Sequence, residues 1–244
     1  MTLPLNQRYH LTIIATFLFL HIASLFTMAS ALSVTAVNVQ FVVKPEQREA
    51  FLKHLKDDAD QTLATEEGNL QFVVGEDIDA PNTFHLHEQY KTDSDYEYHQ
   101  TTKHFKAFAQ FLQGDESPLA EEPVIVAYKC QHHGATTKIA PRPAFCLNVE
   151  SCIKPEFREE FVALMKSHQQ NSLAEPLCMQ FDYGVSLDDP DVFHQHEEFT
   201  GNEQGKEGYE AHQKGAHFDR FMEFNKKDPY IKPQAVRLFK TIFV

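Results

Sequence analysis

The first clear pattern in the chain is an alternation of apolar and polar side chains over residues 37–43. Valine or phenylalanine occupies every second position, and Asn38 and Gln40 lie among the polar positions between them, which is typical of a strand with one buried face. Lys44 and Pro45 follow directly. Because proline at the first helical position loses no intrahelical hydrogen bond, we predict that a helix begins there.

Further elements follow at short intervals. Residues 70–74 and 83–90 predict two strands, and the proline, asparagine and aspartate of residues 77–82 predict a turn between them. Residues 93–113 are expected to be mostly helical, and the β-branched run in residues 123–129 predicts a last strand. The unit therefore reads strand, helix, strand, strand, helix, strand.

This unit occurs twice. Residues 44–51 (KPEQREAF) recur as residues 154–161 (KPEFREEF), and residues 84–88 (FHLHE) recur as residues 193–197 (FHQHE). Further matches are Asn38 with Asn148, Tyr96 with Tyr209, His99 with His212, and His104 with His217. Self-similarity of this extent indicates a tandem duplication.

The length of 244 residues accommodates two domains of ordinary size. We expect them at residues 34–130 and 144–244, joined by a linker at residues 131–143 whose glycine and prolines interrupt any periodicity. Each sheet would carry helices on one face only, so its second apolar face must be buried elsewhere. The sheet of the sister repeat is the expected cover.

The first 31 residues have a different character. An apolar run over residues 11–26 is preceded by Arg8 and followed by Ala29, Ser30 and Ala31, the order of a secretory signal peptide with cleavage after Ala31. We therefore predict entry into the secretory pathway or export from the cell. A retained membrane anchor, or a plastid reached through the endoplasmic reticulum, are the alternatives.

Charge and cysteine usage narrow the function classes. The net charge of −13 repels phosphate backbones, so nucleic acid is not an expected partner. The four cysteines, Cys130, Cys146, Cys152 and Cys178, match no CxxC metal spacing. Cys146 and Cys152, if they share a strand, lie roughly 20 Å apart and cannot form a disulfide. Pairings that involve Cys130 or Cys178 stay open.

A repeat of this order, with Asn38 on the first strand, Glu88 on a later strand and the helical string of residues 96–105 (YEYHQTTKHF), resembles the antibiotic biosynthesis monooxygenase family. The resemblance implies an α+β fold in which each repeat is a ferredoxin-like unit. In that family the sheets pack pairwise into a dimeric α+β barrel, which a tandem chain would form within one polypeptide. Further association through exposed sheet edges stays open.

The same resemblance implies a reaction without metal, flavin or other cofactor. In the family's oxygenases a small quinol or phenolic aromatic substrate loses a proton, and its anion reduces molecular oxygen. The positions that match are His99 and His212 as catalytic bases, Asn38 and Asn148 as catalytic hydrogen-bond donors, and Tyr96 and Tyr209 as substrate-binding residues. The chain has no tryptophan, which the haem-degrading members use, so haem is not an expected ligand.

The placement of His99 depends on whether its helix is continuous. On one unbroken helix His99 would lie opposite the phenylalanine stripe and face solvent. Gly215 of the second repeat corresponds to Thr102, and a break there would turn His99 toward a cavity instead. We read His104 and His217 as packed residues bonded to the backbone.

Two other functions compete with the oxygenase. His85 and His87 lie two residues apart on one strand and would point the same way, as would their counterparts His194 and His196, so each pair could hold a divalent metal. Glu88, and likewise Glu197, would face away from them and tie its strand to a neighbouring element. A non-catalytic barrel that holds an apolar ligand is the third alternative.

Overall fold

A computed structural model of the chain describes residues 34–114, 116–131, 143–202 and 205–243. The elements of the first repeat are β1 (Thr35–Val42), η1 (Pro45–Gln47), α2 (Arg48–Thr65), β2 (Asn69–Asp77), β3 (Thr83–Tyr90), α3 (Asp93–Thr101), α4 (Lys103–Gln113) and β4 (Val124–Cys130). Those of the second repeat are β5 (Phe145–Cys152), η2 (Pro155–Phe157), α5 (Arg158–Ala174), β6 (Cys178–Ser186), β7 (Val192–Phe199), α6 (Lys206–His212), α7 (Ala216–Asn225) and β8 (Ala235–Phe243). The predicted order of elements is confirmed in both repeats.

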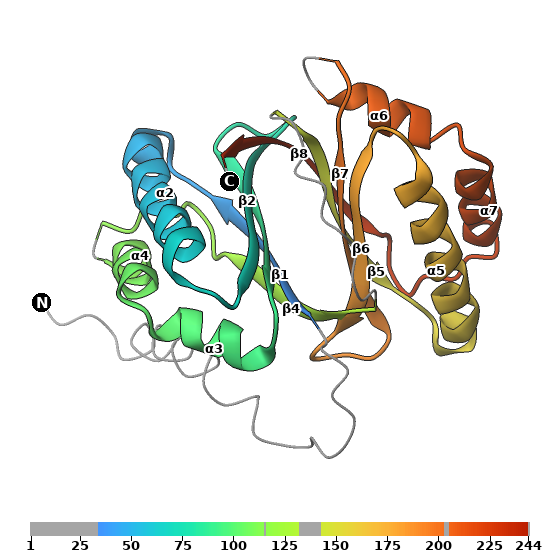
Figure 1. The fold of residues 1–244 in the computed structure, drawn as a ribbon, viewed down its shortest axis with the longest axis horizontal. Helices are drawn as coiled ribbons and strands as arrows, with labels where there is room; N and C mark the ends of the chain where they lie inside the picture. The colour runs from blue at the N-terminus through green and yellow to red at the C-terminus, as the bar shows by residue number, and fades with distance from the viewer. Residues whose placement is uncertain (1–33, 115, 132–142, 203–204, 244) are drawn as a thin grey trace, which may run out of the picture. The chain divides into compact units, whose positions relative to one another are not determined.

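The eight strands form one closed antiparallel barrel. Their order is β1-β3-β2-β8-β5-β7-β6-β4, with β4 paired back onto β1. The two repeats meet along two seams, where β2 pairs with β8 and β4 pairs with β6. Helices cover the outer face of each half (Figure 1). The predicted α+β barrel within a single chain is therefore confirmed.

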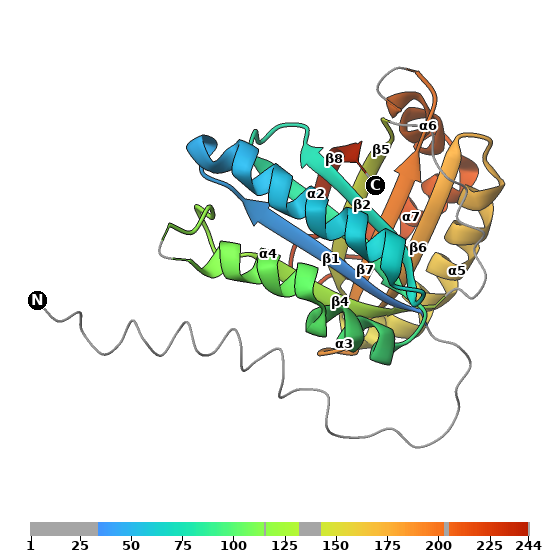
Figure 2. The ribbon, with the colours of Figure 1, turned by 60° about the vertical axis from the view of Figure 1, so that its left-hand side comes forward.

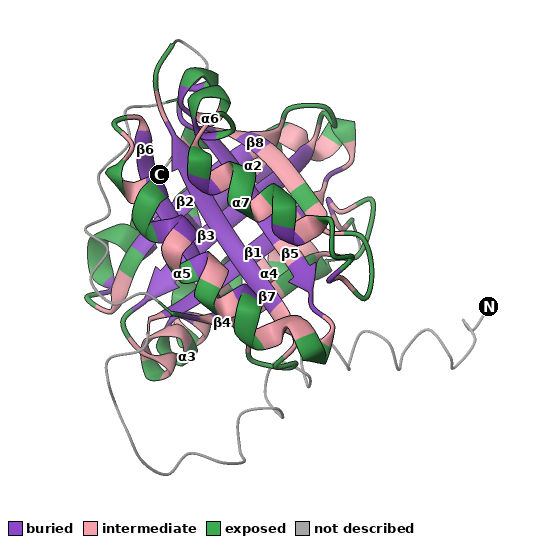
Figure 3. Ribbon diagram, turned by 90° about the vertical axis from the view of Figure 1, so that its right-hand side faces the viewer, coloured by how far each residue is buried: buried purple, intermediate pink, exposed green. Residues whose placement is uncertain are grey.

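Each repeat has its own apolar core between its sheet and its helices. In the first repeat Phe51 of α2 is fully buried, with ring centroids 5.4 Å from Phe41 and 5.1 Å from Phe84. Phe161 takes the matching place in the second repeat, 4.8 Å from Phe193. The buried strands and the exposed outer faces of the helices are visible in Figure 3. The apolar residues of the strand alternation thus form the side of each sheet that faces the helices.

The inner faces of the two sheets cover each other, as expected, and they combine apolar side chains, such as Val73, Cys146 and Phe239, with polar ones. Gln71 donates to Gln180 Oε1 at 2.7 Å, and Gln89 donates to Asp182 Oδ2 at 2.7 Å. Each of these bonds joins one repeat to the other. Buried polar groups are tolerated because their partners lie directly across the barrel.

The long second helix of each repeat is interrupted, as the alternative reading of the sequence required (Figure 2). Thr102 has extended backbone angles, φ −67° and ψ 162°, and its side chain accepts a hydrogen bond from the backbone of Phe105 at the start of α4. Gly215 marks the same break between α6 and α7. Because α3 and α4 are separate helices, His99 lies on a buried face and is 2% exposed.

The predicted signal peptide, residues 1–31, and most of the predicted linker lie outside the described residues. None of the described helices is long and apolar enough to cross a membrane. All four cysteines are buried.

Candidate active site

The second repeat forms a partly open cavity of about 190 Å³ between its sheet and its helices. The β5 and β7 strands form one wall, and α5, α6 and α7 form the other. Its apolar lining is Leu147, Val149, Phe218, Phe221, Met222 and Val236, and its polar lining is His168, Gln195, Glu197, Tyr209, His212, Asn225 and Gln234. An apolar space with a few convergent polar groups is the usual form of a small-molecule site.

His212 lies against this cavity with a carboxyl group behind it. Its Nδ1 lies 3.0 Å from Glu175 Oε2, and the other oxygen of Glu175 lies 3.1 Å from His217 Nε2. Burial lowers the pKa of His212 to about 3, helped by the neighbouring imidazoles of His168 and His217. Burial also raises the pKa of Glu175 to about 7. His212 is therefore a neutral imidazole at neutral pH.

Three further polar residues line the same space. Burial lowers the pKa of His168 to about 4 and raises that of Glu197 to about 8. His168 Nδ1 lies 3.3 Å from the backbone oxygen of His217. Tyr209 stacks on Phe145 with ring centroids 5.1 Å apart. The cavity thus combines neutral histidines, a protonated carboxyl group and an aromatic wall.

The burial of His168 predicts a measurable acid sensitivity. Its pKa falls from the usual 6.5 to about 4 on folding, so between these values the unfolded chain binds a proton that the folded chain does not. Stability therefore falls as the pH drops through this window, by up to about 1.4 kcal/mol per pH unit for this one proton. In His168→Gln we expect the free energy of unfolding, measured with urea, to depend correspondingly less steeply on pH between pH 6.5 and 4.5. Equal slopes in the two proteins would contradict a neutral His168.

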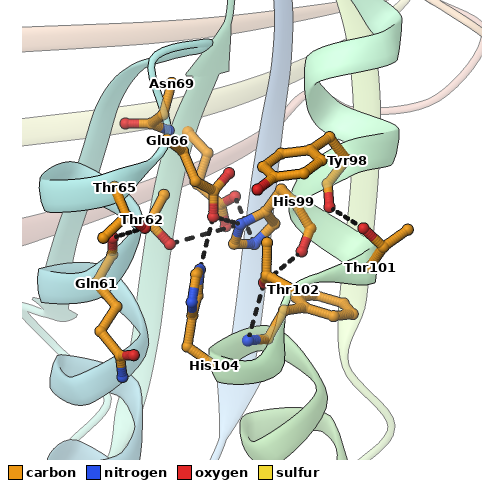
Figure 4. Close-up of polar contacts among 12 residues, drawn as sticks. Gln61, Thr62, Thr65, Glu66, Asn69, Tyr98, His99, Thr101, Thr102 and His104 are labelled. Atoms are coloured by element: carbon orange, nitrogen blue, oxygen red, sulfur yellow. Dashed lines mark hydrogen bonds and ion pairs between the residues drawn. The ribbon is translucent and has the colours of Figure 1, made fainter.

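The first repeat holds the counterparts of Glu175, His212 and His217, but there the pKa values of the glutamate and of the first histidine shift in the opposite directions. Glu66 Oε1 lies 2.9 Å from His99 Nδ1 and 2.6 Å from His104 Nε2 (Figure 4). Burial alone would lower the pKa of His99, but the bond to Glu66 and the charge of Glu88 outweigh it, so this pKa is raised. The bonds to His99 and His104 likewise outweigh burial and lower the pKa of Glu66. The charged form of His99 is thus favoured beside the Glu66 carboxylate.

The two repeats also differ in other residues at corresponding positions of this region. Asp58 occupies the place of His168, and Leu86 and Leu112 occupy those of Gln195 and Asn225. Tyr96 packs on Tyr90 with ring centroids 5.4 Å apart, inside the first apolar core. Of the two tyrosines predicted to bind substrate, only Tyr209 lines the cavity described above.

Asn38 and Asn148 do not share the cavity with the helical histidines, so their predicted grouping needs correction. Asn38 faces His87 across the β1–β3 ladder, and the neighbouring Glu88 points to the other face of the sheet, toward His99. Asn38 accepts from His87 Nδ1 at 2.8 Å and donates to the backbone oxygen of Gln195 at 3.2 Å. It therefore ties the two repeats together inside the barrel.

Asn148 makes the matching bonds, to His196 Nδ1 at 2.7 Å and to the backbone oxygen of Leu86 at 3.2 Å. The two asparagines border a crevice of only about 20 Å³, room for about one water molecule. A substrate would not fit beside them.

The strand histidines point into the barrel, as their spacing predicts, and they pack there against neighbouring side chains. The rings of His87 and His196 stack at 3.7 Å and 5°, and His85 Nε2 turns away to Asp77 Oδ2 at 2.9 Å. Glu88 faces the helices as predicted and accepts a hydrogen bond from Tyr90 Oη at 2.6 Å.

His104 and His217 were expected to bond to the backbone, and this was wrong, because each contacts the carboxyl group of Glu66 or Glu175. These two glutamates were not among the site residues expected from the sequence. Each is the residue that follows its long helix, as Glu66 follows α2 and Glu175 follows α5. Their recurrence in the two repeats was the signal that could have found them.

The comparisons with known proteins agree with this architecture. The sequence pattern of the family described as "Antibiotic biosynthesis monooxygenase" matches residues 35–110 and 144–223. A Bacillus subtilis (strain 168) protein named "Putative monooxygenase YcnE" is 38% identical over 66 residues, which is 27% of this chain and 68% of the relative.

Solved structures share the fold over most of the chain. A protein from Fusobacterium nucleatum described as "Putative monooxygenase" superposes with a TM-score of 0.74 at 14% identity. The match covers 88% of this chain and 94% of the other. An anthrone oxidase-like protein superposes with a TM-score of 0.60 at 13% identity, over 89% and 94% of the two chains. At these identities the likeness concerns the fold alone.

Proposed function

Because the chain belongs to the antibiotic biosynthesis monooxygenase family, we propose that it is a cofactor-independent monooxygenase that oxidises a small quinol or phenolic aromatic substrate in the cavity of its second repeat. The observation that carries the proposal is the neutral imidazole of His212 at the wall of that cavity, with the carboxyl group of Glu175 3.0 Å behind it. A base held by a second group in this way is the usual arrangement for proton abstraction.

In the proposed reaction the substrate supplies all four electrons that reduce molecular oxygen. His212 takes the phenolic proton, and the resulting anion adds O₂ at a ring carbon to give a ring hydroperoxide, which accounts for two electrons. Loss of the hydrogen on that carbon together with cleavage of the O–O bond releases water and takes the other two, so that benzene-1,4-diol and O₂ give hydroxybenzoquinone and H₂O. No external reductant is needed for this balance.

Each polar group of the cavity has a part in the proposal. Ionised Glu175 accepts the Nδ1 proton of His212, which leaves Nε2 as the atom that takes the substrate proton. Protonated Glu197 can donate a hydrogen bond to reduced oxygen. Tyr209 contributes an aromatic wall for the substrate ring.

The cavity size favours a single aromatic ring. An apolar cavity of about 150 Å³ holds benzene, and the cavity described here measures about 190 Å³. A ring with small polar substituents fits this volume.

The test is oxygen consumption by protein treated with a chelator, with benzene-1,4-diol as substrate and ¹⁸O₂ to label the product. We expect uptake above the rate of autoxidation and one labelled oxygen atom in the hydroxyquinone. Tight binding of the diol without any uptake would contradict the proposal and favour the non-catalytic ligand-binding barrel.

A further inference from the structure

A buried charged cluster in the first repeat takes no part in the reaction proposed above. It consists of Glu66, which follows α2, His99 of α3 and His104 of α4 (Figure 4). The side chains of Glu66 and His99 are each 2% exposed and that of His104 is 7% exposed. The cluster is therefore shielded from water and joins the three helices of its repeat.

Both imidazoles of this cluster converge on a single oxygen atom. His99 Nδ1 and His104 Nε2 lie 2.9 Å and 2.6 Å from Glu66 Oε1. Neighbouring ligands of a tetrahedral ion with bonds of about 2.1 Å lie ~3.4 Å apart, and the three ligand atoms of this cluster all lie within 4.8 Å of one another, so a small outward movement of the side chains would admit the ion. Two histidines with one carboxylate form a common ligand set for divalent transition metals.

Two carboxyl oxygens near the cluster are buried without a hydrogen-bond partner among the described residues. They are Glu66 Oε2 and Asp58 Oδ1. Asp58 is 2% exposed and interacts electrostatically with His99 and Glu66. Glu88 Oε2 lies 4.0 Å from His99 Nε2. Two carboxyl oxygens thus lie unpaired beside the two imidazoles, and an unpaired buried polar atom is costly unless a hydrogen-bond donor or a cation compensates it.

The second repeat lacks these features. Glu175 places one oxygen beside each imidazole, Oε2 beside His212 and Oε1 beside His217, so both of its oxygens are used. His168 replaces the carboxyl group of Asp58. The unused acceptor oxygens therefore belong to the first repeat, where they add ligand capacity.

We infer that the first repeat binds one divalent transition-metal ion, with Glu66, His99 and His104 as ligands and the free oxygen of Asp58 beside them. The ion would join α2 to α3 and α4 and stabilise the first half of the barrel. This site is separate from the strand histidines and does not depend on the oxygenase proposal, because the two sites lie in different repeats.

Zn²⁺ is the probe for this site. The full chain, purified without a histidine tag and stripped with a chelator, is dialysed against Zn²⁺, and bound metal per chain is measured by mass spectrometry together with the melting temperature. Glu66→Gln and His104→Gln keep the size and polarity of the site. Glu175→Gln and His217→Gln are the matched controls in the second repeat.

We expect one Zn²⁺ per chain and a raised melting temperature in the wild type and in both controls. In Glu66→Gln and His104→Gln, affinity should fall by more than the roughly 10- to 100-fold that loss of a partner outside the ligand set costs. Circular dichroism of the metal-free proteins shows whether each variant folds, and the inference needs only one of the two to do so. No bound Zn²⁺ in the wild type, unchanged binding in the folded variant, or loss of the ion in a control would each overturn it.

Discussion

Replacement of His212 by asparagine is expected to lower kcat/KM for oxygen-dependent turnover of benzene-1,4-diol by about 100-fold or more, within the 10²- to 10⁴-fold range of general-base catalysis. The imidazole borders the cavity and is neutral because burial lowers its pKa to about 3. Asparagine is close to it in size and polar, but cannot take a proton. Oxygen-electrode kinetics of the two proteins give the ratio directly.

The same change at His99 distinguishes the two repeats. Because the charged form of His99 is favoured beside Glu66, it is expected to contribute no base, so His99→Asn should leave the rate nearly unchanged if circular dichroism shows a folded protein. A loss in His99→Asn as large as in His212→Asn would mean that the first repeat also turns over substrate.

The pH profile adds a second readout for Glu175. Its pKa is raised to about 7 by burial, and only the ionised form leaves His212 Nε2 free of a proton. The rate should therefore rise with pH through about 7, and Glu175→Gln should remove that rise. A profile that is flat in the wild type would contradict the positioning role.

Gly184→Ala is expected to destabilise the protein by about 3 kcal/mol or more, at or beyond the upper end of the usual cost of overpacking. A Cβ atom on Gly184 would lie 2.0 Å from the backbone oxygen of Lys129, across the seam between β6 and β4. The obstacle is backbone, which cannot move aside without opening the seam. Urea unfolding measures the loss.

Gly114→Ala is the matched control. A Cβ there would meet its nearest atom at 3.6 Å, so the same change should alter stability little. Gly75, the counterpart of Gly184, meets Phe239 and the backbone of Lys240 at the other seam. If Gly184→Ala unfolds at the same urea concentration as wild type, the close packing of the seams does not limit stability.

Much of the fold could be read from local sequence. Val37 and Val39 alternate with Asn38 because only one face of their strand packs on helices, and Pro45 begins the helical turn η1 that leads into α2. The break at Thr102 was signalled by its counterpart Gly215, since a glycine in a helix interior is unfavourable. Such features depend on neighbours within a few residues, so both repeats show them in sequence.

The candidate site was harder to predict from the sequence, because strand register brings together residues that are far apart along the chain. Nothing local says that Asn38 pairs with His87 rather than with Glu88, yet a slip by one residue would move its side chain from the barrel interior to the cavity side. Asn38 and His99 were expected from the sequence to serve one catalytic function, and the register places them on opposite faces of the sheet.

By itself the sequence determined the duplication and the order of elements, since these follow from local periodicity repeated in two copies, and its resemblance to the antibiotic biosynthesis monooxygenase family indicated the α+β barrel and the helical histidines. Only the tertiary structure decided which repeat forms a cavity and which holds a charged cluster. That difference arises from a few side chains on separate elements, such as Asp58 against His168 and Leu112 against Asn225. Cavity volume and buried charge depend on how such side chains meet in space, which no local pattern records.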